Sequence, residues 1–127
     1  MKKNRSTIIT GFLIQLTTMA FGRFAYTLIL PDMMQTLKLS NTHMGTLGMG
    51  IVAGYLLNSH FSGKLSRVIG EEQTAKVSML LVSLSLAGLG FFSSFWVLLF
   101  LTVLLGAGSA GSYVPLVSIL NLSLIHI

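Results

Sequence analysis

The sequence predicts an all-α membrane protein with four transmembrane helices. Hydrophobic residues make up 53% of the 127-residue chain and charged residues only 9%, whereas a soluble domain has about 25% charged residues. The apolar residues form four runs, at about residues 7–30, 44–62, 74–92 and 95–116. Each run is long enough to cross a hydrocarbon core of about 30 Å at about 1.5 Å per helical residue.

Most charges lie in short segments between these runs. This arrangement is typical of membrane topology, so the net charge of +5 does not indicate a nucleic-acid partner. The partner that the composition indicates is the lipid bilayer. The chain contains no cysteine, which excludes disulfides and thiolate chemistry.

The first predicted helix, residues 7–30, has one charge inside its apolar run. Arg23 lies seven residues before the end of the run, where Pro31 and Asp32 are expected to stop the span, and therefore roughly 10 Å below the outer surface. At about 100° per residue, one face of this helix collects the substrate-cavity candidates Gln15, Met19, Gly22, Arg23 and Tyr26. The functional interpretation of Arg23 is a cavity charge that meets an anionic or polar substrate. The structural alternative is an arginine hydrogen-bonded to helix carbonyls.

The second predicted helix, residues 44–62, follows an external loop at residues 35–43, whose polar segment around Ser40 is expected to cap it. Gly50 and Gly54 form a G-x-x-x-G pair, which predicts close packing against another helix. His60, near the inner end, is either a proton relay or an ordinary interfacial residue.

Residues 63–73 are the charge-dense part of the chain and are expected to form a short cytoplasmic loop. The third helix, residues 74–92, and the fourth, residues 95–116, are then joined by an external turn at Ser93 and Ser94. Gly106 and Gly108 predict close packing of the fourth helix, and Pro115 predicts either a bend or a point of flexing during transport.

The positive-inside rule sets the expected orientation. Six basic residues fall on one side of the predicted membrane: Lys2, Lys3, Arg5, Lys64, Arg67 and Lys76. Only Lys38 falls on the other side. We therefore expect a multi-pass protein of the cell inner (plasma) membrane, with a cytoplasmic N-terminus and both termini on the same side.

The segment between the second and third helices resembles motif A of the major facilitator superfamily (MFS) of secondary transporters. Gly63, Leu65 and Gly70 stand at matching positions. The charges depart from the motif, because Arg67 stands where the family has aspartate and Glu71 where it has a basic residue. A reversed ion pair of Arg67 with Glu71 or the following glutamate is expected in place of the usual contact.

Two further stretches narrow the resemblance to the YbfB/YjiJ-like branch of these transporters: residues 22–33, GRFAYTLILPDM, and residues 53–57, AGYLL. The resemblance implies an N-terminal part of the six-helix half of an MFS fold. It also implies a secondary active carrier of a small molecule, working by alternating access with the proton as the coupling ion. The motif B arginine of the family falls on Thr102 here, so proton coupling through that residue is unsupported.

Residues 122–127, LSLIHI, read as the translation of a mosaic-end adaptor used in transposon-based sequencing libraries. We expect an assembly artefact at this end of a truncated carrier. The alternative is the short apolar start of a fifth helix.

Two other functional classes compete with a transporter. A complete four-helix membrane protein, acting as an oligomeric exporter or as an interaction subunit, is the alternative, although small exporters rely on a membrane-embedded glutamate and the four spans contain no acidic residue. An enzyme is not expected, because the serines are scattered and the histidines lack metal-ligand spacing. The sequence therefore predicts no catalytic residues, no cofactor and no metal site.

Overall fold

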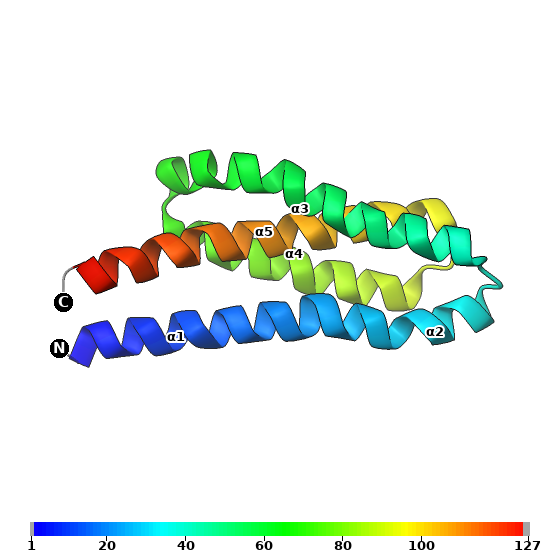
Figure 1. Ribbon diagram of the computed structural model, residues 1–127, viewed down its shortest axis with the longest axis horizontal. Coiled ribbons are helices and arrows are strands. Elements are labelled where there is room, and N and C mark those ends of the chain that lie inside the picture. The colour runs from blue at the N-terminus through cyan, green and yellow to red at the C-terminus, as the bar shows by residue number, and fades with distance from the viewer. Residues whose placement is uncertain (1, 126–127) are drawn as a thin grey trace.

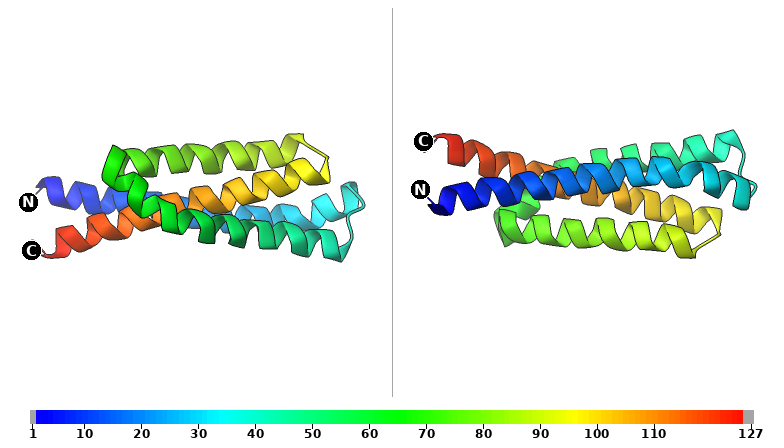
Figure 2. Two further views of the ribbon diagram at one scale, coloured as in Figure 1. Left: turned by 90° about the horizontal axis from the view of Figure 1, so that it is seen from above. Right: turned by 90° about the horizontal axis from the view of Figure 1, so that it is seen from below.

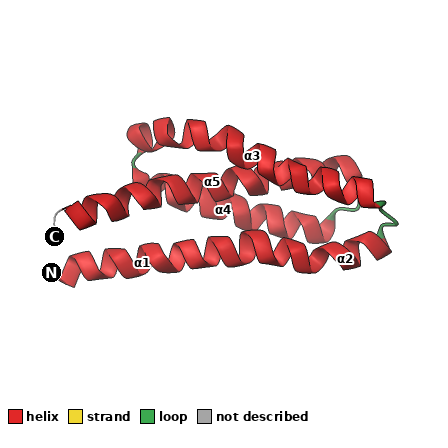
Figure 3. Ribbon diagram, viewed as in Figure 1, coloured by secondary structure: helices red, strands yellow, loops and turns green. Residues whose placement is uncertain are grey.

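The computed structural model describes residues 2–125, and these residues form a helical bundle without a strand. The elements in order are α1 (Lys2–Met19), the π-helix η1 (Ala20–Ala25), α2 (Tyr26–Thr36), α3 (Asn41–Ile69), α4 (Glu71–Phe91) and α5 (Phe95–Ile125). The first three follow one another directly and form one long rod (Figures 1 and 3). The predicted all-α fold class is confirmed.

The bundle has the surface of a membrane protein. Among the described residues, three helical segments are long and apolar enough to span a membrane: Ile8–Thr36, Glu71–Phe91 and Phe95–Tyr113. Large apolar side chains point outward, and Phe91 is 86% and Leu28 76% exposed. Such a surface suits lipid rather than water. Helix α3 is not one of these three segments, but it is also long, with 29 residues.

Helix α5 lies at the centre of the bundle. It runs between α3 and α4 (Figure 2), and α1 also packs against it. Leu98, Thr102 and Leu105 of α5 are fully buried. The other helices are therefore positioned mainly by their contacts with α5.

Glycines bring the backbones of α3 and α5 into contact. A Cβ atom added to Gly54 would collide with the carbonyl oxygen of Val103, and one added to Gly106 would collide with that of Ile51. Contacts of this kind allow glycine Cα–H groups to approach carbonyl oxygens across a helix interface. Asn58 strengthens the same interface, because its Nδ2 donates to the carbonyl oxygen of Ala107 at 2.7 Å.

Two other glycines named from the sequence also lie on α5 contacts. A Cβ at Gly50 would lie 2.7 Å from the Thr102 hydroxyl oxygen. One at Gly108 would lie 3.0 Å from the carbonyl oxygen of Ser78, on α4. Gly50 therefore faces the α3–α5 contact and Gly108 the α4–α5 contact.

The first helix does not end at Pro31, as the sequence predicted, but continues to Thr36. Proline removes one backbone hydrogen bond and crowds the preceding turn, yet membrane helices accept it where neighbouring groups satisfy the freed carbonyl. A turn at Leu37 and Lys38, the latter with a φ of 51°, then leads into α3.

The predicted cap of the second helix is confirmed. Ser40 is the N-cap of α3, and its hydroxyl accepts a hydrogen bond from the backbone N–H of His43 at 3.3 Å. The Nδ1 atom of His43 accepts in return from the Ser40 backbone N–H at 3.4 Å, which completes a capping box. The His43 ring also lies edge-on to Phe95, with 4.7 Å between ring centroids. This contact joins the starts of α3 and α5.

The prediction that residues 63–73 form a loop is wrong. Residues 63–69 continue α3, Glu71 begins α4, and Gly70 alone separates the two helices. Gly63 is therefore helical and forms no turn, whereas Gly70 adopts φ 93° and ψ 150°, a conformation that is essentially restricted to glycine. Lys, Leu and Arg are good helix formers, so a charge-dense stretch with this composition can remain helical.

The reversed ion pair expected between Arg67 and the glutamates is also wrong. Glu71 Oε1 instead accepts a hydrogen bond from the hydroxyl of Ser118, on α5, at 2.6 Å. Glu72 pairs with Lys76 one turn later in α4, at 2.7 Å.

The fourth predicted helix also continues past residue 116, and α5 ends at Ile125. The described part of the tail, residues 122–125, belongs to α5 and does not begin a fifth helix. His126 and Ile127 lie outside the described residues. The first and last described residues lie at the same end of the bundle as the α3–α4 junction (Figure 1).

Candidate functional site

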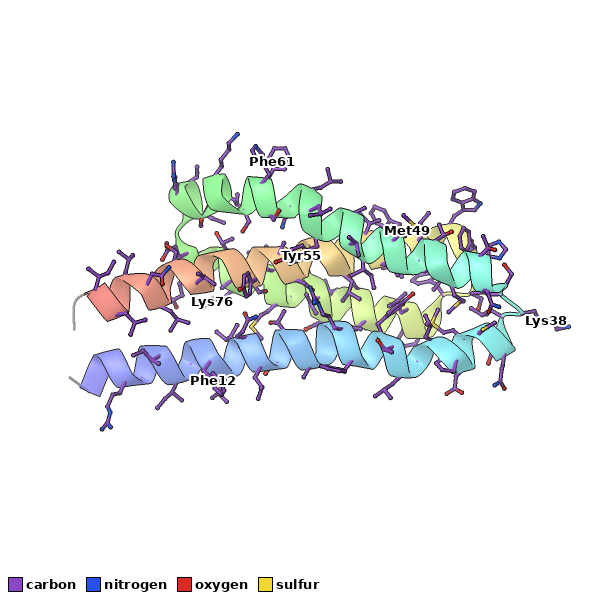
Figure 4. All side chains as sticks on the ribbon, in the orientation of Figure 1. Phe12, Lys38, Met49, Tyr55, Phe61 and Lys76 are labelled. Carbon is purple, nitrogen blue, oxygen red and sulfur yellow. The ribbon has the colours of Figure 1, made fainter. Side chains whose placement is uncertain are left out.

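A cavity of about 330 Å³ lies between the first helical rod, α3 and α5. Its lining combines one charge, two tyrosines, two hydroxyl side chains and several small or apolar residues: Arg23, Tyr26, Thr27, Gly48, Ile51, Val52, Tyr55 and Ser109. The volume is at the lower end of the range for small-molecule sites. Figure 4 marks Tyr55 about midway along the bundle, whereas Phe12 and Phe61 point away from it.

Arg23 supplies the charge of this cavity. Its Cζ atom lies 5.8 Å from the centroid of the Tyr55 ring, within the range of a cation–π contact. None of the residues that line the cavity is acidic. The guanidinium thus faces an aromatic ring and a space without a carboxylate, which makes the cavity electropositive.

Two polar groups beside Arg23 have no hydrogen-bond partner among the described residues. The hydroxyl of Tyr26 is one, although only 7% of that residue is exposed. The Oε1 atom of Gln15 is the other, and it adjoins a small extension of the cavity of about 10 Å³ that Arg23, Tyr55 and Ser109 also line. A space of this size holds about one water-sized group. Both groups are therefore available to a ligand or a water molecule.

A π-helix carries the central part of the site. Gly22 and Arg23 lie in η1, between two ordinary α-helical segments. A threonine on either side of it donates a hydrogen bond from its hydroxyl to the backbone carbonyl oxygen four residues earlier. Thr18 donates to Ile14 at 2.8 Å, and Thr27 donates to Arg23 at 2.9 Å. π-helical segments are rare and occur frequently at functional sites, because they redirect side chains from a continuing helix.

Four of the five residues that the sequence placed on one face lie at this site. Arg23 and Tyr26 line the cavity, and Gln15 lines its extension. Gly22 is buried next to Ser109, whose hydroxyl oxygen would lie 3.3 Å from an added Cβ. The side chain of Met19 lies outside the described residues.

Sequence reasoning did not place Tyr55 or Ser109 in the site. A signal was present for each, since Tyr55 directly follows the packing residue Gly54 and Ser109 is a polar residue within a glycine-rich run. A hydroxyl-bearing residue beside a close helix contact is well placed to face a cavity at the edge of that contact.

The motif A-like residues Gly63, Leu65, Arg67, Gly70 and Glu71 do not join this cavity. They lie at the α3–α4 junction, near the two ends of the chain (Figure 1). Any role of theirs is therefore separate from ligand binding in the cavity.

A comparison with protein families matches residues 15–126 to the family described as the uncharacterised MFS-type transporter YbfB. No curated protein and no solved structure matches the chain. The match covers the Arg23 helix, the α3–α4 junction and α5, so it includes every element that builds the cavity. The resemblance predicted from the sequence is confirmed: the chain is a multi-pass membrane protein that belongs to the YbfB family of MFS-type transporters.

Proposed function

We propose that these helices form part of a secondary active carrier that binds a small anionic or polar molecule next to Arg23 and moves it by alternating access. One observation carries the proposal: Arg23 lies in a cavity of about 330 Å³ whose lining contains no carboxylate. An arginine in the membrane interior without a counter-charge costs at least roughly 2.5 to 3.5 kcal/mol. A ligand that brings a negative charge would remove much of this cost.

The shape of the site supports the same function. Secondary carriers hold their substrate near the membrane midplane, often where a helix departs from regular α-geometry. Here η1 interrupts the first rod at Arg23. The unpartnered Tyr26 hydroxyl and Gln15 carbonyl oxygen add one potential hydrogen-bond donor and one acceptor for the ligand.

The proposed orientation places the N-terminus and the α3–α4 junction in the cytoplasm, with the protein in the inner membrane. The basic residues at this end support it, by the positive-inside rule. The proton is the proposed coupling ion, on the basis of the family resemblance.

Reconstitution in liposomes tests the function. A full-length carrier of this family with the same cavity should show saturable uptake of organic anions under an imposed proton gradient. Residues 1–127 alone should show none, because alternating access requires two repeats that move against each other around the substrate. A full-length carrier that moves organic cations and no anion would contradict the proposed substrate class.

The same experiment distinguishes the alternative function. Saturable uptake by residues 1–127 alone, lost on substitution of Arg23, would mean that the four helices assemble into a working exporter. The truncated-carrier interpretation would then be replaced.

A further inference from the structure

The last three turns of α3 carry two parallel stripes of exposed side chains. At about 100° per residue, His60, Lys64 and Arg67 follow one line along the helix at spacings of four and three residues. All three side chains are exposed. We call them the basic stripe. The line next to it is formed by the exposed apolar residues Phe61, Leu65 and Val68.

The apolar stripe is not covered by the bundle. Phe61 is 58%, Leu65 43% and Val68 82% exposed. Figure 4 shows Phe61 pointing away from the other helices.

The basic stripe has no acidic partner among the described residues. The carboxylates at this end of the bundle are Glu71 and Glu72. Glu71 accepts the hydrogen bond from Ser118, and Glu72 is paired with Lys76. The charges of Lys64 and Arg67 are therefore available to an external anion.

From this arrangement we propose that the end of α3 is a binding site for anionic phospholipids. The apolar stripe contacts the acyl chains near the membrane surface, and Lys64 and Arg67 contact the phosphate of the headgroup. Helices with an apolar face beside a basic face lie at the lipid interface, and each surface Lys or Arg favours anionic lipid by about 1 kcal/mol, which is about fivefold. This site is separate from the Arg23 cavity and does not depend on the proposed transport function.

A fluorescent label on a single cysteine measures the lipid next to the stripe. Because the chain has no cysteine, Val68→Cys gives one labelling position beside Lys64 and Arg67. The labelled protein is reconstituted in bilayers that contain, at equal mole fraction, either brominated phosphatidylglycerol or brominated phosphatidylcholine as the quencher. We expect brominated phosphatidylglycerol to be favoured about fivefold or more at low salt, and less at 1 M salt, where the Debye length falls to about 3 Å.

Substitutions identify the charges responsible. Lys64→Gln with Arg67→Gln should reduce the preference to about one, whereas the charge-conserving pair Lys64→Arg with Arg67→Lys should retain it. Lys38→Gln is the matched control, because Lys38 is an exposed lysine at the opposite end of the bundle (Figure 4), and it should leave the preference unchanged. Two results would overturn the proposal. One is equal quenching of the label by the two brominated lipids when Lys64 and Arg67 are both present, and the other is a preference for brominated phosphatidylglycerol that remains after Lys64→Gln with Arg67→Gln.

Discussion

Gly54→Ala and Gly106→Ala should each separate α3 from α5. Either new methyl group would collide with a backbone carbonyl oxygen of the facing helix, of Val103 or of Ile51. Overpacking of a filled interface costs about 1 to 3 kcal/mol, and a backbone atom cannot move aside as a flexible side chain can. We therefore expect each change to lower the free energy of unfolding by about 3 kcal/mol or more, measured by reversible unfolding of the protein in bicelles.

Gly63→Ala is the matched control for this effect. Gly63 lies in the same helix as Gly54, but nothing lies within 4 Å of an added Cβ. Alanine is favoured over glycine in an open helical position by about 0.5 to 1 kcal/mol, so this change should be neutral or stabilising. If Gly54→Ala and Gly106→Ala were as stable as Gly63→Ala, the α3–α5 contact described above would be wrong.

Arg23→Ala should abolish most transport in a full-length carrier with this cavity. Losing one partner of a fully desolvated charge pair costs about 2 to 5 kcal/mol. Arg23 is exposed in these helices, so the lower end of that range applies, and about 2 kcal/mol corresponds to a loss of roughly 30-fold in uptake efficiency. Arg23→Lys keeps the positive charge but loses the planar guanidinium, which can donate two hydrogen bonds to one anion. The loss of one charged hydrogen bond costs about 1.5 kcal/mol, so we expect roughly a tenfold decrease in uptake efficiency.

Initial uptake rates, corrected for the amount of folded carrier in the membrane, check this result. Arg5→Ala serves as the control, because Arg5 is exposed near the N-terminus and far along the rod from the cavity. Expression should remain close to that of the unsubstituted carrier in all three variants. Unchanged uptake by Arg23→Ala would show that Arg23 has only a structural role.

Local patterns in the sequence predicted much of the fold. The apolar runs located the helices, and Ser40 was correctly identified with the cap of α3 because capping depends on neighbouring residues. The predicted helix boundaries were less accurate at positions where the surrounding residues outweighed a local signal for a helix end. Pro31 is helical, and so is the segment from Gly63 to Ile69, because apolar surroundings and good helix formers extended both helices.

From the sequence, only the part of the candidate site that lies on a single helix could be predicted. Gln15, Arg23 and Tyr26 share a face of the first rod, and helical periodicity is sufficient to find such a face. Tyr55 and Ser109 come from two other helices, and their place in the cavity depends on how α3 crosses α5 at Gly54 and Gly106. The π-helix η1 has no signature in residues 20–25, so the direction in which it turns Arg23 had to come from the structure.

The measurement that tests the Arg23 cavity most directly is the reaction of single cysteines with charged, membrane-impermeant thiol reagents in a full-length carrier. Ser109→Cys lies in the cavity, whereas Phe12→Cys and Met49→Cys replace side chains that are 63% and 74% exposed on the lipid-facing surface. Ser109→Cys should react, and about tenfold faster with an anionic reagent than with a cationic one of similar size, because the Arg23 charge concentrates anions in the cavity. This preference should disappear when Arg23→Gln is added, and the two lipid-facing cysteines should remain unreactive. Equal rates with the two reagents at Ser109→Cys, or a preference that persists without Arg23, would contradict an electropositive, water-filled substrate cavity at this site.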